Sequence, residues 1–208
     1  MRTLVIETAT AACSVALIEG GVVIAHAHEV VGRGHAERLV PMIAELPDGG
    51  RAESILVDVG PGSFTGIRVG VAAARGLGLG WGIPVHGYSS LALIAAAQFA
   101  PDPGVRDLAV ILEGGHGEVF MQSFIAEPFS TTAELASLTP TEALARLDGR
   151  IAVGNGVRFL TTLDPDLDAR DVLPDAASAR LLPPAFTALP PRPIYGRAPD
   201  ARPMAVAR

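Results

Sequence analysis

Hydrophobic and polar residues in the first fifty positions follow first a strand pattern and then a helix pattern. Three short apolar runs, at residues 3–8, 13–18 and 22–29, predict an antiparallel meander with Gly20 in its second turn. Residues 35–46 then carry two apolar stripes at helical spacing. Two stripes imply two burial partners, of which one is the sheet and the other is a neighbouring helix or another subunit.

A glycine-rich loop separates the next predicted strand from the next predicted helix. Residues 55–59 are a short apolar run, residues 60–66 read GPGSFTG, and residues 67–79 form a helix pattern whose polar side chains are Arg68 and Arg75. Each glycine inside a helix costs about 1 kcal/mol relative to alanine. Tertiary packing must offset that cost, so we expect a second helix to pack closely along this one.

The rest of the chain predicts a second, smaller lobe. A helix beginning near Ser90 ends before the sequence PDPG at residues 101–104, which is the best candidate for a boundary. Residues 108–125 predict a hairpin around GGHG, and Thr139 opens a capped helix. We therefore predict an N-terminal lobe at 1–103, a C-terminal lobe at 104–190 and a basic, proline-rich, partly ordered tail at 191–208.

The composition is that of a globular α/β protein. Of the 208 residues, 49% are hydrophobic and 18% are charged. The most apolar stretch, residues 69–83, is shorter than the roughly 20 residues that a membrane-spanning helix needs. Residues 2–18 lack the pattern of an export signal, and Cys13 is the single cysteine. These features predict a protein of the reducing cytoplasm.

Charge and side-chain usage exclude several functions. The net charge of −6 argues against a chain that holds nucleic acid alone, because phosphate binding needs a basic surface. All 16 basic residues are arginine. Without lysine there is no P-loop lysine, no lysine Schiff base and no serine-lysine dyad.

The loop GPGSFTG is a candidate anion site, but its details favour a structural turn. A glycine loop before a helix presents backbone N–H groups to an anion. The spacing matches neither phosphate-binding glycine pattern nor the G-x-S-x-G pattern of hydrolases, and Pro61 removes one donor. A peptidase that uses Ser63 is disfavoured because the sequence places no histidine to activate it. A phosphate site stays open as the alternative.

Four segments together resemble one known family. In order, they are ETATAACSVALIEGG, HAERLVPMI, GPGSFTGIRVGVAAARGLGLG and PVHGYSSLALIA. They resemble the TsaB (YeaZ) family, which is required for threonylcarbamoyladenosine formation in tRNA. Beyond the first hundred residues only GEVFMQSF, VGNG and PIYGR match. The resemblance implies an actin-like, ASKHA-type (ribonuclease H-like) α/β fold of two related lobes, each with a mixed sheet flanked by helices.

The resemblance also implies a non-catalytic scaffold. Family members bind TsaD, the subunit that transfers the threonylcarbamoyl group, together with the ATPase TsaE, and they also form homodimers. It implies no cofactor for this chain alone, ATP and Mg in the assembled complex, and contact with tRNA only through that complex. The segment HGYSSLALIA contains His86 but no H-x-x-x-H, so the metal site of the transferase is expected to be absent.

Two sets of residues follow from the resemblance. The expected partner surface lies on the two helices and comprises Leu39, Met42, Ile43, Leu46, Arg68, Val71, Ala74, Arg75 and Gly78. Where the first strand of active relatives ends in a nucleotide-facing aspartate, this chain has Glu7. The expected vestigial nucleotide-facing set is Glu7, Gly60, Gly62, Ser63 and Thr65. The alternative function is a stand-alone ASKHA-type ATP-binding enzyme that uses the glycine loop and Glu7.

Overall fold

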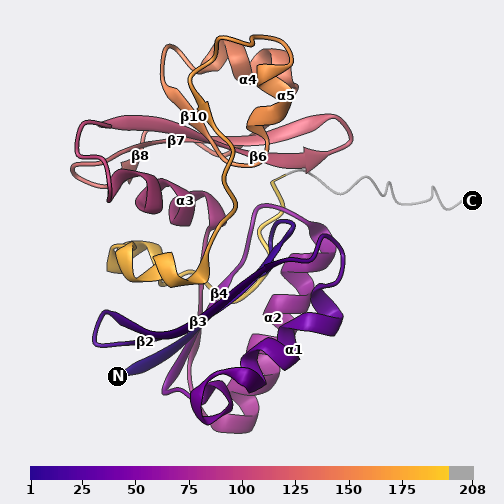
Figure 1. The fold of residues 1–208 in the computed structure, drawn as a ribbon, viewed down its shortest axis with the longest axis vertical. Helices are drawn as coiled ribbons and strands as arrows, with labels where there is room; N and C mark the ends of the chain where they lie inside the picture. The colour runs from indigo at the N-terminus through magenta and orange to yellow at the C-terminus, as the bar shows by residue number, and fades with distance from the viewer. Residues whose placement is uncertain (197–208) are drawn as a thin grey trace, which may run out of the picture.

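The N-terminal half of the chain forms a five-stranded mixed sheet. The computed structural model describes residues 1–196 (Figure 1). The strands lie in the order β3 (Val22–Val30), β2 (Ala12–Glu19), β1 (Arg2–Glu7), β4 (Ser54–Asp58) and β5 (Val85–Tyr88). Strands β1 to β3 are the predicted antiparallel meander, while β4 and β5 run parallel to β1.

The second sheet repeats the arrangement of the first sheet at its centre. Its strands lie in the order β11 (Ala169–Arg170), β10 (Ile151–Val153), β6 (Asp107–Gly115), β7 (Glu118–Ile125) and β8 (Ser130–Thr131), and β9 (Ala136–Leu138) also pairs with β7. Strand β6 is antiparallel to β7, which confirms the predicted hairpin, and parallel to β10. In the same way β1 is antiparallel to β2 and parallel to β4.

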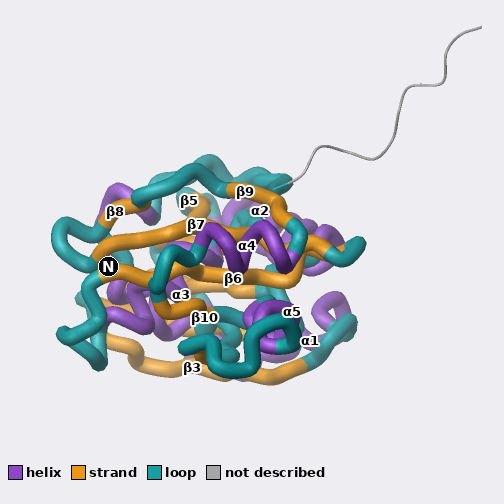
Figure 2. The backbone as a smooth tube through the Cα atoms, turned by 90° about the horizontal axis from the view of Figure 1, so that it is seen from above, coloured by secondary structure: helices purple, strands orange, loops and turns teal. Residues whose placement is uncertain are grey.

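Helices cover the outer face of each sheet. Helices α1 (His35–Glu45) and α2 (Phe64–Trp81) lie side by side on the first sheet, and η1 (Pro47–Gly50) follows α1 (Figure 1). Helices α4 (Pro140–Arg146) and α5 (Val157–Thr161) cover the second sheet, and Figure 2 shows α4 lying over β7. None of the helices among residues 1–196 is long and apolar enough to cross a membrane.

A shared apolar layer lies between the two sheets. It contains α3 (Ser90–Phe99), which contacts β6 and β7, and η2 (Ala176–Leu181), which contacts β1, β2 and β3 (Figure 1). Short η3 (Pro184–Phe186) follows η2. Val5 of β1 points into this layer, whereas Leu4 and Ile6 point toward α1 and α2. Both faces of β1 are buried at its centre, which explains the three consecutive apolar residues Leu4, Val5 and Ile6.

The helices begin and end where local chemistry dictates. The capping box at the start of α4 is confirmed, because Thr139 and Glu142 exchange side-chain to backbone hydrogen bonds. Helix α2 is longer than the predicted 67–79. It begins at Phe64 because the Ser63 hydroxyl accepts from the N–H of Gly66 at 3.3 Å, and it ends before Gly82, whose φ is 68°.

The glycines of α2 serve two different purposes. A Cβ on Gly66 or Gly70 would collide with Thr8 at the end of β1, and one on Gly78 would collide with Val85 of β5. These glycines therefore let the helix approach its own sheet, and the expectation that a second helix explains them is wrong. The same expectation stays open for Gly76 and Gly80, which point into open space.

The end of the described chain returns to the first lobe. The backbones of Gly87 and Leu189 exchange hydrogen bonds at 2.6 and 3.0 Å, and the N–H of Ile194 donates to the carbonyl of Val59 at 2.7 Å. The division at residues 103 and 190 stays a prediction, but residues 176–194 pack on strands of the N-terminal sheet. Of the predicted tail, residues 197–208 lie outside the described residues.

Candidate functional site

Most of the predicted partner surface is buried inside the chain itself. The apolar stripes of α1 and α2 pack on Leu4, Ile6 and Leu17 of the first sheet. The residues buried in this way are Leu39, Met42, Ile43, Leu46, Val71, Ala74 and Gly78. For these seven the prediction is wrong, because the most apolar stripe of an amphipathic helix packs against its own core first. Arg68 and Arg75 are exposed and remain predicted partner residues.

The sides of α1 and α2 that face away from the sheet expose several apolar and small residues, with Arg75 among them on α2. We call this surface the outer helical face and define it as Ala36, Val40, Ala72, Gly76, Leu79 and Gly80. Val40 is 61% exposed and Leu79 is 87% exposed. Beside them the side chains are small, so a partner could approach the backbone closely.

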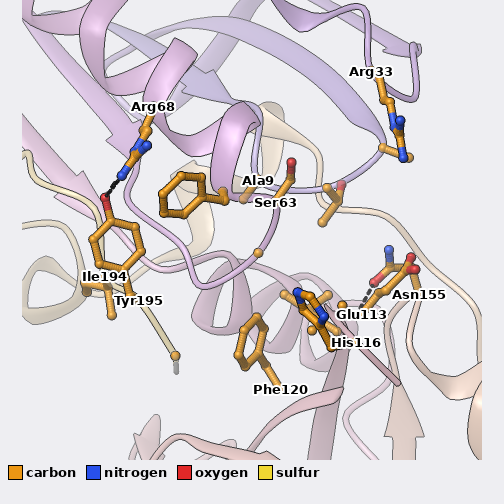
Figure 3. A pocket seen from close by; sticks show the side chains of 18 of the residues that line it. Ala9, Arg33, Ser63, Arg68, Glu113, His116, Phe120, Asn155, Ile194 and Tyr195 are labelled. Carbon is orange, nitrogen blue, oxygen red and sulfur yellow. Dashed lines mark hydrogen bonds between the residues drawn. The ribbon is translucent and has the colours of Figure 1, made fainter. Parts of the chain in front are cut away.

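A cavity of about 810 Å³ lies between the lobes and is open at one side. Its first wall comes from the β1–β2 turn (residues 9–11), the residues after β3 and the start of α2; its second wall comes from the β6–β7 hairpin and Asn155 (Figure 3). The end of the described chain, residues 194–196, closes one edge. Ionisable side chains that line it are Arg33, Arg68, Glu113 and His116.

The mouth of this cavity carries an aromatic and arginine cluster. The guanidinium of Arg68 donates to the hydroxyl of Tyr195 at 3.0 and 3.2 Å (Figure 3). The carbon of the guanidinium lies 3.4 Å from the centroid of the Phe64 ring. The rings of Phe64 and Tyr195 are 5.4 Å apart. Tyr195 is a site residue that sequence reasoning did not single out, although it lies in the matched segment PIYGR.

In the second wall of the cavity, the carboxylate of Glu113 forms an ion pair. Glu113 accepts from the Arg158 guanidinium at 2.6 Å. The N–H of Glu113 also donates to the Oδ1 of Asn155 at 3.2 Å (Figure 3). Among residues 1–196 no group of three or more histidine, cysteine, aspartate or glutamate side chains is placed to hold a metal ion.

The glycine loop reaches the cavity at only two of its predicted positions. Gly62 and Ser63 line the cavity, whereas Gly60 and Thr65 do not. The N–H of Ser63 donates to the Ala9 carbonyl at 2.6 Å. Together with the capping bond to Gly66, this contact makes Ser63 a structural link between the β1–β2 turn and α2.

Glu7 does not face the cavity, so its predicted nucleotide-facing role is wrong. Its side chain is fully buried and is not among the cavity residues. One carboxyl oxygen accepts from the N–H of Ala9 at 2.9 Å and the other from the Tyr88 hydroxyl at 3.0 Å. Burial and the neighbouring carboxyl of Asp58 raise the pKa of Glu7 well above its usual value. Burial also raises the pKa of Asp58, to about 6.

Two stacked lobes with equivalent central strands and a cavity between them define a protein of the actin-like ASKHA class, which confirms the predicted fold class. Residues 9–149 match the family described as "TsaD: tRNA N6-adenosine threonylcarbamoyltransferase". The chain is 35% identical to the tRNA threonylcarbamoyladenosine biosynthesis protein TsaB of Escherichia coli, over 91% of this chain and 85% of that protein. The chain belongs to the TsaB (YeaZ) family.

Solved structures agree with this assignment. YeaZ from Pseudomonas aeruginosa is similar with a TM-score of 0.75 and 28% identity, over 86% of this chain and 89% of that one. A second Pseudomonas aeruginosa structure, an uncharacterized protein with similarity to peptidase YEAZ, has a TM-score of 0.78 and 26% identity, over 94% of this chain and 99% of that one. The likeness therefore extends over both lobes.

Proposed function

We propose that this chain is a non-catalytic scaffold subunit in the formation of threonylcarbamoyladenosine in tRNA. In this proposal it binds TsaD, and with it TsaE, in the cytoplasm, and so enables threonylcarbamoyl transfer to the adenosine next to the anticodon. ATP and Mg act in the assembled complex, and tRNA is contacted only through that complex. Family membership supports the pathway, and the relatives carry the corresponding name.

The observation that carries the partner role is the outer helical face. Val40 and Leu79 expose large aliphatic side chains on adjacent helices. Gly76 and Gly80 weaken α2 and make no close packing contact that would offset their cost within the described chain. Both features are explained if a helix of TsaD, or of a second copy of this chain in the homodimer, packs against this face.

The test introduces an arginine on the outer helical face and, as a control, an arginine at an exposed position elsewhere. We expect Ala72→Arg to abolish the complex with purified TsaD and TsaE and the tRNA modification that depends on it, because an arginine cannot be buried unpaired in an apolar interface. Ala133→Arg, at an exposed position of the second lobe, is the control and should leave both unchanged. Intact complex formation with Ala72→Arg would show that the outer helical face is not the partner surface.

The alternative function, a stand-alone ATP-binding enzyme, retains one supporting observation. Gly62 and Ser63 lie at the start of α2 in the wall of a cavity large enough for a small ligand. The buried position of Glu7 weakens this alternative. Calorimetry of Mg-ATP with the isolated chain separates the two functions, because tight binding without TsaD would favour the enzyme.

A further inference from the structure

The carboxyl groups of Glu7 and Asp58 lie next to each other in the core, at the adjacent ends of β1 and β4. Strands β1 and β4 are parallel neighbours, and Ile6 pairs with Val57. The next residues of the two strands, Glu7 and Asp58, are both 0% exposed. Within residues 1–196 neither carboxyl forms an ion pair with a basic group. Two buried carboxylates in contact without a cation are not stable, so the charge of one must be neutralised.

One of the two carboxyl oxygens of Asp58 lacks a hydrogen-bond donor in the described part of the chain. Its Oδ1 accepts from the N–H of Gly60 at 2.7 Å and from the N–H of Ser90 at 3.1 Å. Its Oδ2 is buried and has no donor in the described part of the chain. A buried acceptor without a donor costs about 1–3 kcal/mol or more, so native structures rarely retain one.

Glu7 is placed to supply that donor. Its Oε1 accepts from the N–H of Ala9, so Oε2 is the oxygen left to carry a proton. The hydroxyl of Tyr88, which lies 3.0 Å from Oε2, also lies 3.1 Å from the carbonyl of Ile6. Tyr88 can therefore donate to Ile6 when Oε2 of Glu7 is protonated.

We propose that Glu7 and Asp58 share one proton, carried by Glu7 and donated to Asp58 Oδ2, and that this hydrogen bond fixes the buried ends of β1 and β4 to each other. Through Ala9 it holds the β1–β2 turn, and through Gly60 and Ser90 it holds the glycine loop and the start of α3. The glycine loop leads directly into α2. This hydrogen bond forms within the isolated chain, so the proposal does not depend on the proposed scaffold role.

The contribution of the Glu7–Asp58 hydrogen bond to stability depends on pH, because among residues 1–196 no cationic group beside the pair compensates a second negative charge. Tyr88 from β5 and Cys13 from β2 face the pair, and neither is cationic. Asp175, ahead of η2, acts on Tyr88 and lies 3.4 Å from the Nε2 of His26. Burial raises the pKa of Asp58 to about 6, and burial with the charge of Asp58 raises the pKa of Glu7 well above its usual range. Both folded-state pKa values exceed the unfolded values. Their stabilising contribution is therefore complete at acid pH and is lost as the pH rises through them.

The direct test is a titration of the side-chain carboxyl carbons of the purified full chain by NMR. The proposal expects one of the two buried carboxyls, assigned to Glu7, to remain protonated at pH 7, and the Glu7 signal to move toward the carboxylate position in Asp58→Asn. If both carbons report carboxylates at pH 7 in the unchanged protein, the proposal is overturned. This measurement needs no variant to fold.

A stability measurement provides the second test. The Tm of the unchanged protein should fall as the pH rises from about 5 to about 8, by several degrees, because a change of about 1 kcal/mol moves the Tm of a chain this size by about 2–4 °C. In Glu7→Gln the side-chain amide can donate to Asp58 at any pH. The fall in Tm between pH 5 and pH 8 should therefore be smaller than in the unchanged protein, and the Tm at pH 8 should be higher. Glu113→Gln is the matched control and should keep the fall; equal pH profiles for Glu7→Gln and the unchanged protein would contradict the proposal.

Discussion

The first strands of the two lobes occupy equivalent places, yet Glu7 at the end of β1 and Glu113 near the end of β6 have opposite surroundings. Strands β1 and β6 each pair with one antiparallel and one parallel neighbour. Glu7 is fully buried beside Asp58, whereas the Glu113 side chain is 44% exposed and bound to Arg158. The pKa of Glu7 is raised well above its usual value. One topology therefore carries a buried acid pair in one lobe and a surface ion pair in the other.

The neighbouring parallel strand decides the difference. In the first lobe β4 ends in Asp58, so the end of β1 meets a second acid. In the second lobe β10 is followed by Asn155, whose amide oxygen accepts from the backbone of Glu113. An amide brings no charge, and Arg158 on α5 neutralises the carboxylate of Glu113. The charge environment of each glutamate thus depends on the side chains that the fold places beside it.

The largest expected effect is at the acid pair. Asp58→Ala leaves the N–H groups of Gly60 and Ser90 without an acceptor, so we expect the free energy of unfolding to fall by about 3 kcal/mol. The equivalent change in the second lobe, Asn155→Ala, removes one acceptor and should lower it by about 1 kcal/mol. Urea denaturation at pH 7 measures both. Equal losses would mean that the two strand ends are energetically alike.

A smaller effect is expected from the tyrosine that supports Glu7. Tyr88→Phe removes a buried O–H donor without changing the packing, so the free energy of unfolding should fall by about 1 kcal/mol. The same hydrogen bond lowers the pKa of Glu7, so its loss should raise that pKa further. Denaturation and the carboxyl titration measure the two effects. A lower pKa of Glu7 in this variant would contradict the hydrogen-bond assignment.

The smallest effect is expected at the surface ion pair. Arg158→Ala removes the partner of Glu113, but both side chains are about half exposed. Water and salt screen such pairs, so the loss should be below about 1 kcal/mol and smaller still in 0.5 M salt. Urea denaturation at two salt concentrations measures it. A loss as large as that of Asp58→Ala would remove the contrast between the lobes.

The strands and helices were predictable because each one leaves a local signal. The three apolar runs between residues 3 and 29, the hairpin at 108–125 and the capping box at Thr139 all predict the observed elements. The partner surface was predicted mostly from residues of α1 and α2 that face the sheet, and its location on these helices stays a prediction. A helix with two apolar stripes does not show which stripe is buried, because that depends on where the sheet lies.

The candidate site was less predictable than the fold. Gly62 and Ser63 reach the cavity as expected for a loop before a helix, but Glu7 points into the core. Tyr195 meets Arg68 across 127 positions of sequence. Such long-range contacts join chain segments that approach each other only in the folded protein, so no spacing in the sequence predicts them.

The sequence alone determined the order of elements, the glycine loop into an apolar helix and, through four matched segments, the family. These features are local or are carried by contiguous motifs. Only the tertiary structure decided which helix face stays exposed, that Gly66 and Gly70 approach Thr8, and that Glu7 meets Asp58. The physical reason is that burial and charge neutralisation depend on neighbours in space, and the carboxyls of Glu7 and Asp58, 51 positions apart, become partners only when β1 and β4 pair.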